Sequence, residues 1–144
     1  MNRSLLAAAL LASLPGSAFA QDTQSFDRVE RGRYLSVLGD CAGCHTAPGG
    51  APFAGGLTLD TPFGKLLAPN ITPDRETGIG NLTDDEFVSA LHEGRSHNGR
   101  RLYPAMPYPA YTKMTEDDVR AMRAYFRTVA PVRLRKWISS AMTR

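Results

Sequence analysis

Both cysteines of this 144-residue chain lie in one five-residue motif, CAGCH, at residues 41–45. Two residues separate Cys41 from Cys44, so a helix places the two thiols about one turn apart. His45 follows directly and can project from the same turn. Such a turn presents two thiols and one imidazole to a single ligand. The rest of the chain must be arranged around that ligand, so this motif limits the possible folds more than any other feature.

The first 20 residues have the composition of a secretory signal peptide. One basic residue, Arg3, precedes an apolar run from Leu5 to Leu14, and the segment ends in the small-x-small pattern Ala18-Phe19-Ala20. This run is too short to span a bilayer, and we expect cleavage after Ala20. Export would place the cysteines in an oxidising compartment. We therefore predict a periplasmic mature protein without a transmembrane segment, either soluble or bound peripherally through a partner.

The remaining 124 residues, from 21 to 144, suit one compact domain with one hydrophobic core. We expect the domain to cover residues 21–132 and a basic C-terminal tail to cover residues 133–144. Without Arg3 the chain has 16 basic and 14 acidic residues, a balance that argues against nucleic-acid binding through bulk charge. For the tail, we favour packing on the domain over contact with a partner.

Three segments have the apolar spacing and the end signals of helices. They cover about residues 26–38, 83–94 and 115–130. In the second segment, Thr83 and Glu86 have the spacing of a capping box. A short additional helix is expected at the cysteines. Because no run of alternating apolar residues is long enough to predict a sheet, the sequence indicates an all-α fold.

The segment between the cysteine motif and the second helix, Thr46 to Asn81, is rich in glycine and proline. A connection of this length without helices or strands is unusual inside a compact domain. A flat apolar cofactor would supply the apolar surface that these residues lack, and glycine lets the backbone approach such a ring closely. We therefore interpret the segment as a loop that wraps around a cofactor.

The cysteine motif has four possible uses. A thioredoxin-like redox pair requires a βαβ setting, and the strand patterns for one are absent. A zinc site requires further ligands, and His92 and His97 are not spaced as a second pair. A disulfide between Cys41 and Cys44 would be strained and would close almost no loop. In an exported chain, the motif instead indicates one haem c, held through two thioether bonds, with His45 as the proximal iron ligand.

The second axial ligand of the iron separates an electron carrier from a haem enzyme or gas sensor. Met106 is the favoured candidate, because the prolines around it reduce the freedom that its loop would lose on binding iron. Met122 lies on the apolar face of the third helix and Met114 directly precedes that helix, so we assign both to the core. We expect His92 and His97 to be solvated, and His97 stays an alternative ligand.

Three segments together resemble a known family: residues 31–64, with the cysteine motif; residues 70–95, with NITPD and GIGNLTDDEF; and residues 99–126, with LYPAMPYP. They resemble the haem domains in the cytochrome c subunits of periplasmic alcohol, aldehyde and gluconate dehydrogenases. They are also similar to single-haem electron-transfer partners of molybdenum hydroxylases such as nicotinate or isoquinoline dehydrogenases. The resemblance covers about residues 30–132. Many members carry three such domains, whereas this chain has one haem motif.

The resemblance implies a class I cytochrome c fold with three main helices, a short haem-attachment helix and long haem-wrapping loops. It implies haem attachment at Cys41 and Cys44, with His45 and Met106 as axial ligands. In that fold the first and last helices cross where a small residue lets a ring approach. Gly32 would supply the small residue here, and Tyr125 or Phe126 would supply the ring.

The function that follows is electron transfer rather than catalysis. We expect a monohaem cytochrome that accepts single electrons from a periplasmic dehydrogenase. It would pass them to a cytochrome, a quinone-linked enzyme or a terminal oxidase of the respiratory chain. Two alternatives remain at this stage: a haem protein with an open sixth site, acting as a gas sensor or a peroxidase-like enzyme, and a structural haem subunit of a dehydrogenase complex.

Overall fold

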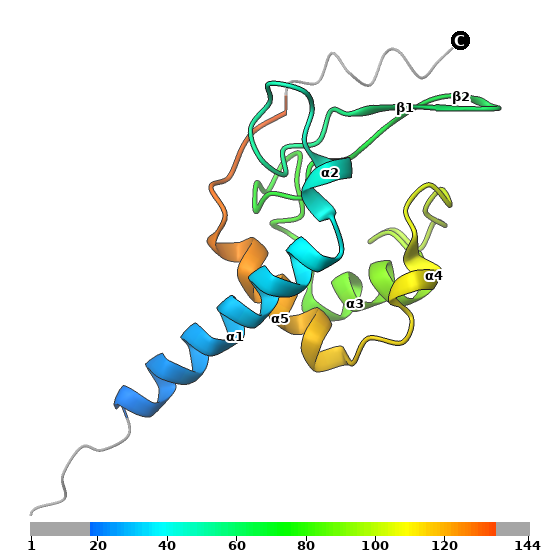
Figure 1. Cartoon of the computed structure of the whole chain (residues 1–144). Helices are drawn as coiled ribbons and strands as arrows, with labels where there is room; N and C mark the ends of the chain where they lie inside the picture. Colours follow the sequence, from blue (N-terminus) through cyan, green and yellow to red (C-terminus); the bar gives the residue numbers. More distant parts are fainter. Residues whose placement is uncertain (1–17, 135–144) are drawn as a thin grey trace, which may run out of the picture.

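The computed structural model describes residues 18–134, with side chains from residue 25 onward. Its helices are α1 (Ala18–Leu38), α2 (Cys41–His45), α3 (Asp84–Glu93), α4 (Tyr108–Tyr111) and α5 (Glu116–Thr128), and its strands are β1 (Thr58–Thr61) and β2 (Gly64–Leu67). Figure 1 shows α1 crossing α5, with α3 beside α5 and the hairpin of β1 and β2 extending near α2. Residues 1–17 of the expected signal peptide and residues 135–144 of the expected tail lie outside the described residues. Within the described residues, no helix combines the length and the apolar character needed to cross a membrane.

The small sheet corrects the expectation of a fold made only of helices. β1 and β2 pair antiparallel, with Thr58 opposite Leu67 and Thr61 opposite Gly64. The turn between them is closed by Thr61, whose hydroxyl donates to the Gly64 carbonyl at 2.6 Å and accepts the Phe63 N–H at 3.2 Å. Strands of four residues are too short to give a recognisable alternating pattern, so backbone pairing and turn chemistry define this hairpin.

The ends of α1 differ in how well the sequence predicted them. The helix begins at Ala18, earlier than the expected residue 26, and ends at Leu38 as expected. The Gly39 N–H donates to the Leu35 carbonyl at 2.9 Å, and Asp40 takes a left-handed conformation with φ of 49°. Aspartate tolerates this conformation better than most residues. The two residues after α1 therefore redirect the chain into α2.

Helices α1 and α5 cross at Gly32. A Cβ added to this buried glycine would lie 1.9 Å from the carbonyl oxygen of Ala121 and 2.9 Å from the backbone nitrogen of Met122. The expected role of Gly32 is therefore confirmed. Its nearest neighbours are backbone atoms of α5, so the two helices meet backbone to backbone at this point. The Phe126 ring packs edge-to-face on Phe53, with 5.3 Å between ring centroids, and the approach of a Tyr125 or Phe126 ring to Gly32 stays a prediction.

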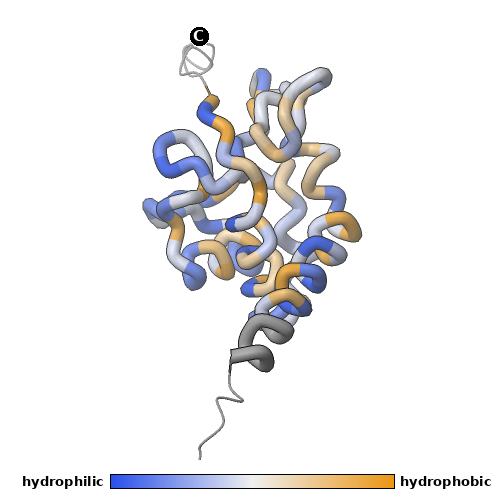
Figure 2. The backbone as a smooth tube through the Cα atoms, turned by 90° about the vertical axis from the view of Figure 1, so that its left-hand side faces the viewer, coloured by the Kyte–Doolittle hydropathy of each residue, from blue (hydrophilic) through white to orange (hydrophobic). Residues whose placement is uncertain are grey.

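The hydrophobic core lies between α1, α3 and α5. Its buried cluster consists of Leu35, Phe87, Leu91, Val119, Met122 and Phe126. Figure 2 shows hydrophobic and hydrophilic stretches following one another along the helices, as expected of helices that bury one side. Met122 is 2% exposed, which confirms its assignment to the core.

The capping box predicted for α3 is present. The Thr83 hydroxyl accepts the Glu86 N–H at 3.2 Å, and the Glu86 carboxylate accepts the Thr83 N–H at 2.8 Å. The helix ends at Gly94, which has a left-handed φ of 62°. At the start of α5, Thr115 likewise accepts the Asp118 N–H at 3.2 Å. These side chains satisfy N–H groups that have no partner within the first helical turn.

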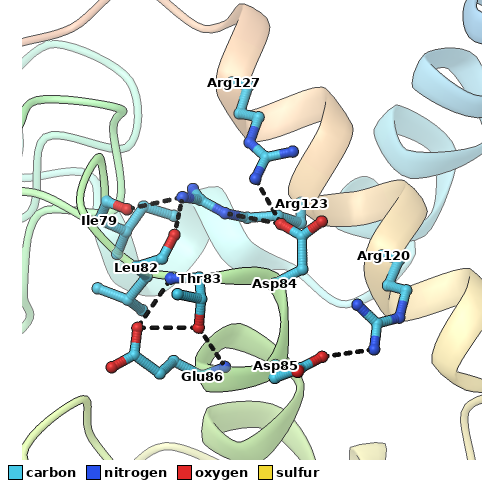
Figure 3. Close-up of polar contacts among 9 residues, drawn as sticks. All are labelled: Ile79, Leu82, Thr83, Asp84, Asp85, Glu86, Arg120, Arg123 and Arg127. Atoms are coloured by element: carbon cyan, nitrogen blue, oxygen red, sulfur yellow. Dashed lines mark hydrogen bonds and ion pairs between the residues drawn. The ribbon is translucent and has the colours of Figure 1, made fainter.

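A buried arginine joins α5 to the turn before α3 (Figure 3). Arg123 is 1% exposed, and its Nη2 donates to the carbonyls of Ile79 and Leu82 at 3.0 and 2.7 Å. Its Nε lies 3.9 Å from a carboxylate oxygen of Asp84, which also accepts from Arg127 at 2.5 Å. Burial, with a smaller contribution from the nearby Arg127, lowers the pKa of Arg123, and guanidinium groups stay charged in proteins. This cation fixes the position of α3 relative to α5.

Candidate functional site

The cysteine motif forms helix α2 directly after the turn at Gly39 and Asp40. Cys41 and Cys44 are both partly buried and are not joined in a disulfide. Burial, with a smaller contribution from the Asp40 carboxylate, raises the pKa of Cys41 to about 11. A thiol with this pKa stays protonated near neutral pH, whereas a reactive redox cysteine requires a lowered pKa. The thioredoxin-like interpretation is therefore disfavoured by the chemistry of Cys41 itself.

The zinc interpretation also lacks support in the described residues. No three His, Cys, Asp or Glu side chains are grouped there in a way that could hold a metal ion. The two cysteines and His45 therefore do not form a zinc site by themselves.

His45 has a defined orientation and protonation. Its Nδ1 lies 2.8 Å from the carbonyl oxygen of Pro69. A carbonyl only accepts hydrogen bonds, so Nδ1 carries the proton and Nε2 keeps its lone pair in the neutral ring. Burial lowers the pKa of His45, and the bond to Pro69 opposes this effect in part. A neutral imidazole that donates Nδ1–H to a carbonyl has the arrangement typical of metal-ligating histidines.

The loop rich in glycine and proline folds back onto His45. The Gly55 N–H donates to the His45 carbonyl at 2.8 Å. Gly55 has a left-handed φ of 75°, and an added Cβ would lie 2.5 Å from the carbonyl carbon of Pro69. Only glycine allows this approach. The loop thus places the Pro69 carbonyl beside the imidazole, a contact between residues 24 positions apart in the sequence.

The loop that contains Met106 lies on the same core as the cysteine turn. Met106 and Cys41 are both partly buried and pack against the core cluster. The Met106 N–H donates to the Tyr103 carbonyl at 3.0 Å. From α4, the Tyr111 hydroxyl donates to the Gly39 carbonyl at 3.0 Å, and burial raises the pKa of this tyrosine. This hydrogen bond fixes the segment after Met106 to the residues just before Cys41.

The remaining candidate ligands occupy three kinds of position. Met114 is partly buried and packs on the core, as expected. His97 is exposed. His92 is partly buried, and its Nε2 is buried without a hydrogen-bond partner among the described residues, so the expectation that His92 is solvated is wrong for this nitrogen.

A family model identifies the chain: the model for cytochrome c matches residues 29–130. This chain belongs to the cytochrome c family. The matched range includes the cysteine motif, Pro69 and Met106. Membership confirms the family resemblance seen in the sequence, and this family implies covalently bound haem c, as the cysteine motif had indicated.

Three curated relatives illustrate the relationship. The gluconate 2-dehydrogenase cytochrome c subunit of Pantoea cypripedii is 47% identical over 133 residues, which cover 92% of this chain and 30% of that subunit. A nicotinate dehydrogenase subunit of Pseudomonas putida is 50% identical over 105 residues, covering 73% of this chain and 9% of the relative. A protein of Cereibacter sphaeroides named diheme cytochrome c-type is 34% identical over 147 residues, covering 91% of this chain and 50% of the relative. The chain thus spans only a part of each relative.

The residues of the site fit a covalently attached haem. Two unpaired thiols share helix α2 with an imidazole whose Nε2 carries a lone pair rather than a proton, and the partly buried thioether of Met106 packs on the same core as Cys41. Sequence reasoning predicted these four side chains as the haem site but missed Pro69, which orients His45, and Tyr111, which ties the segment after Met106 to Gly39. The only local signal for Pro69 was its place in the proline-rich loop, and Tyr111 carried none.

Proposed function

We propose that the chain is a monohaem c-type cytochrome that carries single electrons from a periplasmic dehydrogenase to the respiratory chain. The observation that carries this proposal is the neutral His45, held by the Pro69 carbonyl beside two unpaired thiols, in a chain of the cytochrome c family. Haem c would be attached at Cys41 and Cys44. When bound, it supplies the one-electron couple of its iron.

The chain's own residues would hold and tune that iron. His45 offers Nε2, and the hydrogen bond from its Nδ1 to Pro69 increases the electron density that the ring donates. Met106 would provide the second ligand, a thioether, which favours a higher reduction potential than a second imidazole. Its attachment to the cysteine turn through Tyr111 restrains the loop that carries it.

The partners follow from the relatives and from the amino terminus. Relatives named as parts of gluconate and nicotinate dehydrogenases support a dehydrogenase as the electron donor. A cytochrome, a quinone-linked enzyme or a terminal oxidase would be the acceptor. The signal-peptide pattern in residues 1–20 supports a periplasmic location. In this proposal the dehydrogenase carries out the chemistry on the substrate, and the chain itself is no enzyme.

Spectroscopy of the haem-loaded chain and its Met106→Ala variant tests the proposal. We expect the oxidised wild type to show the weak red absorption of a thioether bound to iron, and the reduced wild type to exclude carbon monoxide. Met106→Ala should lose the absorption, bind carbon monoxide and have a lower reduction potential. Met114→Leu, which changes a methionine next to the core, is the matched control and should behave like the wild type. A reduced wild type that binds carbon monoxide readily would contradict the proposal and favour an open sixth site.

A further inference from the structure

The residue after Pro69 has a fully satisfied, buried side chain. Asn70 is 3% exposed. Its Nδ2 donates to the Val132 carbonyl at 2.6 Å and to the Thr77 hydroxyl at 3.0 Å. Its Oδ1 accepts the Thr72 N–H at 2.8 Å and the Thr72 hydroxyl at 2.7 Å. A buried amide that makes four hydrogen bonds has one fixed position, and it ties the backbone at Asn70 to Thr72, Thr77 and Val132.

Two of these partners also hold the segment that follows α5, residues 132–134, which we call the C-terminal strap. The Val132 N–H donates to the Thr72 hydroxyl at 3.1 Å, and the Leu134 N–H donates to the Thr77 hydroxyl at 2.9 Å. Arg133 forms an ion pair with Glu76. Figure 1 shows the chain running from the end of α5 toward the loops near α2. The strap therefore holds the loop from Asn70 to Thr77 in place.

Pro69 lies between this network and His45. On one side, its carbonyl accepts the His45 Nδ1–H, and its carbonyl carbon lies against Gly55 so closely that no side chain fits there. On the other side, its peptide bond continues directly into Asn70. The hydrogen bonds of Asn70 therefore help to hold the backbone at Pro69 against the imidazole, together with the backbone bonds of Ala68 to Gly56 and Leu57.

We propose that Asn70 is a positioning residue for His45, acting through the Pro69 carbonyl, and that the C-terminal strap supports it. The inference rests on the proposed function, in which His45 binds the haem iron. A hydrogen bond from Nδ1 makes the imidazole a stronger donor, and a stronger donor stabilises the oxidised iron. Weakening the hold on Pro69 therefore raises the reduction potential. A residue with only a structural role would lower stability and leave the potential unchanged.

The test compares two asparagines of one loop in the haem-loaded chain. Asn70→Ser shortens the positioning side chain. Asn81→Ser is the matched control, because Asn81 is exposed and its Nδ2 donates to the Arg75 carbonyl at 2.7 Å, away from Pro69. The measurements are the reduction potential and the hydrogen-exchange rate of the His45 Nδ1 proton in the reduced protein. We expect Asn70→Ser to raise the potential and to speed exchange about tenfold, equivalent to about 1.4 kcal/mol. Asn81→Ser should change neither.

Two further variants separate positioning from stability. Thr77→Val removes one acceptor of the Asn70 amide and is the milder variant to use if Asn70→Ser does not fold. It should also raise the reduction potential and speed exchange of the His45 Nδ1 proton, each by less than Asn70→Ser does. Gly32→Ala destabilises the remote helix crossing and should leave both unchanged. If Asn70→Ser or Thr77→Val loses stability with wild-type potential and exchange, the inference is wrong. A wild type without a histidine-ligated haem spectrum would instead refute the proposed function, and the inference with it.

Discussion

Replacing Gly32 by alanine tests the packing that holds the two longest helices together. In the structure, an added Cβ would lie 1.9 Å from the Ala121 carbonyl oxygen and 2.5 Å from its carbonyl carbon. Real Cβ atoms essentially never come closer than 3.0 Å to such atoms. Because the opposing atoms belong to the backbone of α5, no side-chain rotation can relieve the overlap. The helices must therefore separate by about 1 Å, which overpacks and disturbs a well-filled core.

The magnitude follows from two opposing effects. Overpacking of this kind costs about 1–3 kcal/mol, and contacts with a rigid backbone favour the upper part of that range. Alanine is a better helix former than glycine by about 1 kcal/mol, which offsets part of the cost. The free energy of unfolding should fall by about 1–2 kcal/mol for Gly32→Ala and by about 2–3 kcal/mol for the bulkier Gly32→Val. For a domain of this size, the alanine variant should melt roughly 4–8 °C lower.

Urea and thermal unfolding of the haem-loaded protein, followed by far-ultraviolet circular dichroism, measure this change. Val37→Ala is the control on the same helix, since Val37 is 70% exposed and its truncation should change stability by less than about 0.5 kcal/mol. If Gly32→Ala is as stable as the wild type, α1 and α5 do not meet at this glycine and the described crossing is wrong.

Three further predictions concern charged side chains. Arg31 donates to the Asp118 carboxylate at 2.9 Å, and this contact lowers the pKa of Asp118. The contact therefore stabilises the fold at pH values above the ordinary aspartate pKa. This stabilisation is lost as the pH falls through the lowered pKa of Asp118. Asp118→Asn should thus lower stability more at pH 7 than in acid below the ordinary aspartate pKa, and equal losses of stability in urea titrations at both pH values would contradict this. Arg123→Ala removes a buried cation that donates to the partly buried carbonyls of Ile79 and Leu82, and it should cost about 2–4 kcal/mol in the same assay. A loss below about 0.5 kcal/mol would refute that role. Arg100 and Arg101 are exposed and lie just before the Met106 loop, where their charges could steer an acidic partner. Replacing both with glutamate should slow electron transfer with such a partner at low salt. An electron-transfer rate that changes with neither the salt concentration nor the charge reversal would exclude electrostatic steering by these arginines.

The parts of the fold that the sequence predicted correctly are specified by neighbouring residues. The capping box of Thr83 and Glu86 spans three positions, and glycine at position 94 provides the left-handed conformation that ends α3. The cysteine motif likewise contains its own chemistry, because two thiols and an imidazole at this spacing are recognisable without the rest of the chain. Local signals of this kind can be recognised in the sequence alone because they do not depend on tertiary contacts.

The parts that the sequence could not predict depend on contacts between distant positions. The Pro69 carbonyl meets His45 only because Gly55 admits the loop between them, and Tyr111 reaches Gly39 across 72 positions. The burial of the His92 Nε2 was not predicted either, since a polar residue near the end of a helix is expected to be exposed until the elements packed around it are known. Such contacts leave no periodic pattern in the sequence.

Covalent attachment of haem underlies the proposed function, and the mass of the denatured, reduced polypeptide measures it without reference to any partner. We expect the wild type, after denaturation with a reducing agent, to retain the mass of one haem. Replacing both cysteines, Cys41→Ala with Cys44→Ala, should abolish this retention. A wild-type chain that has the mass of the bare polypeptide, with its haem extracted freely into acidic organic solvent, would contradict covalent attachment and the function built on it.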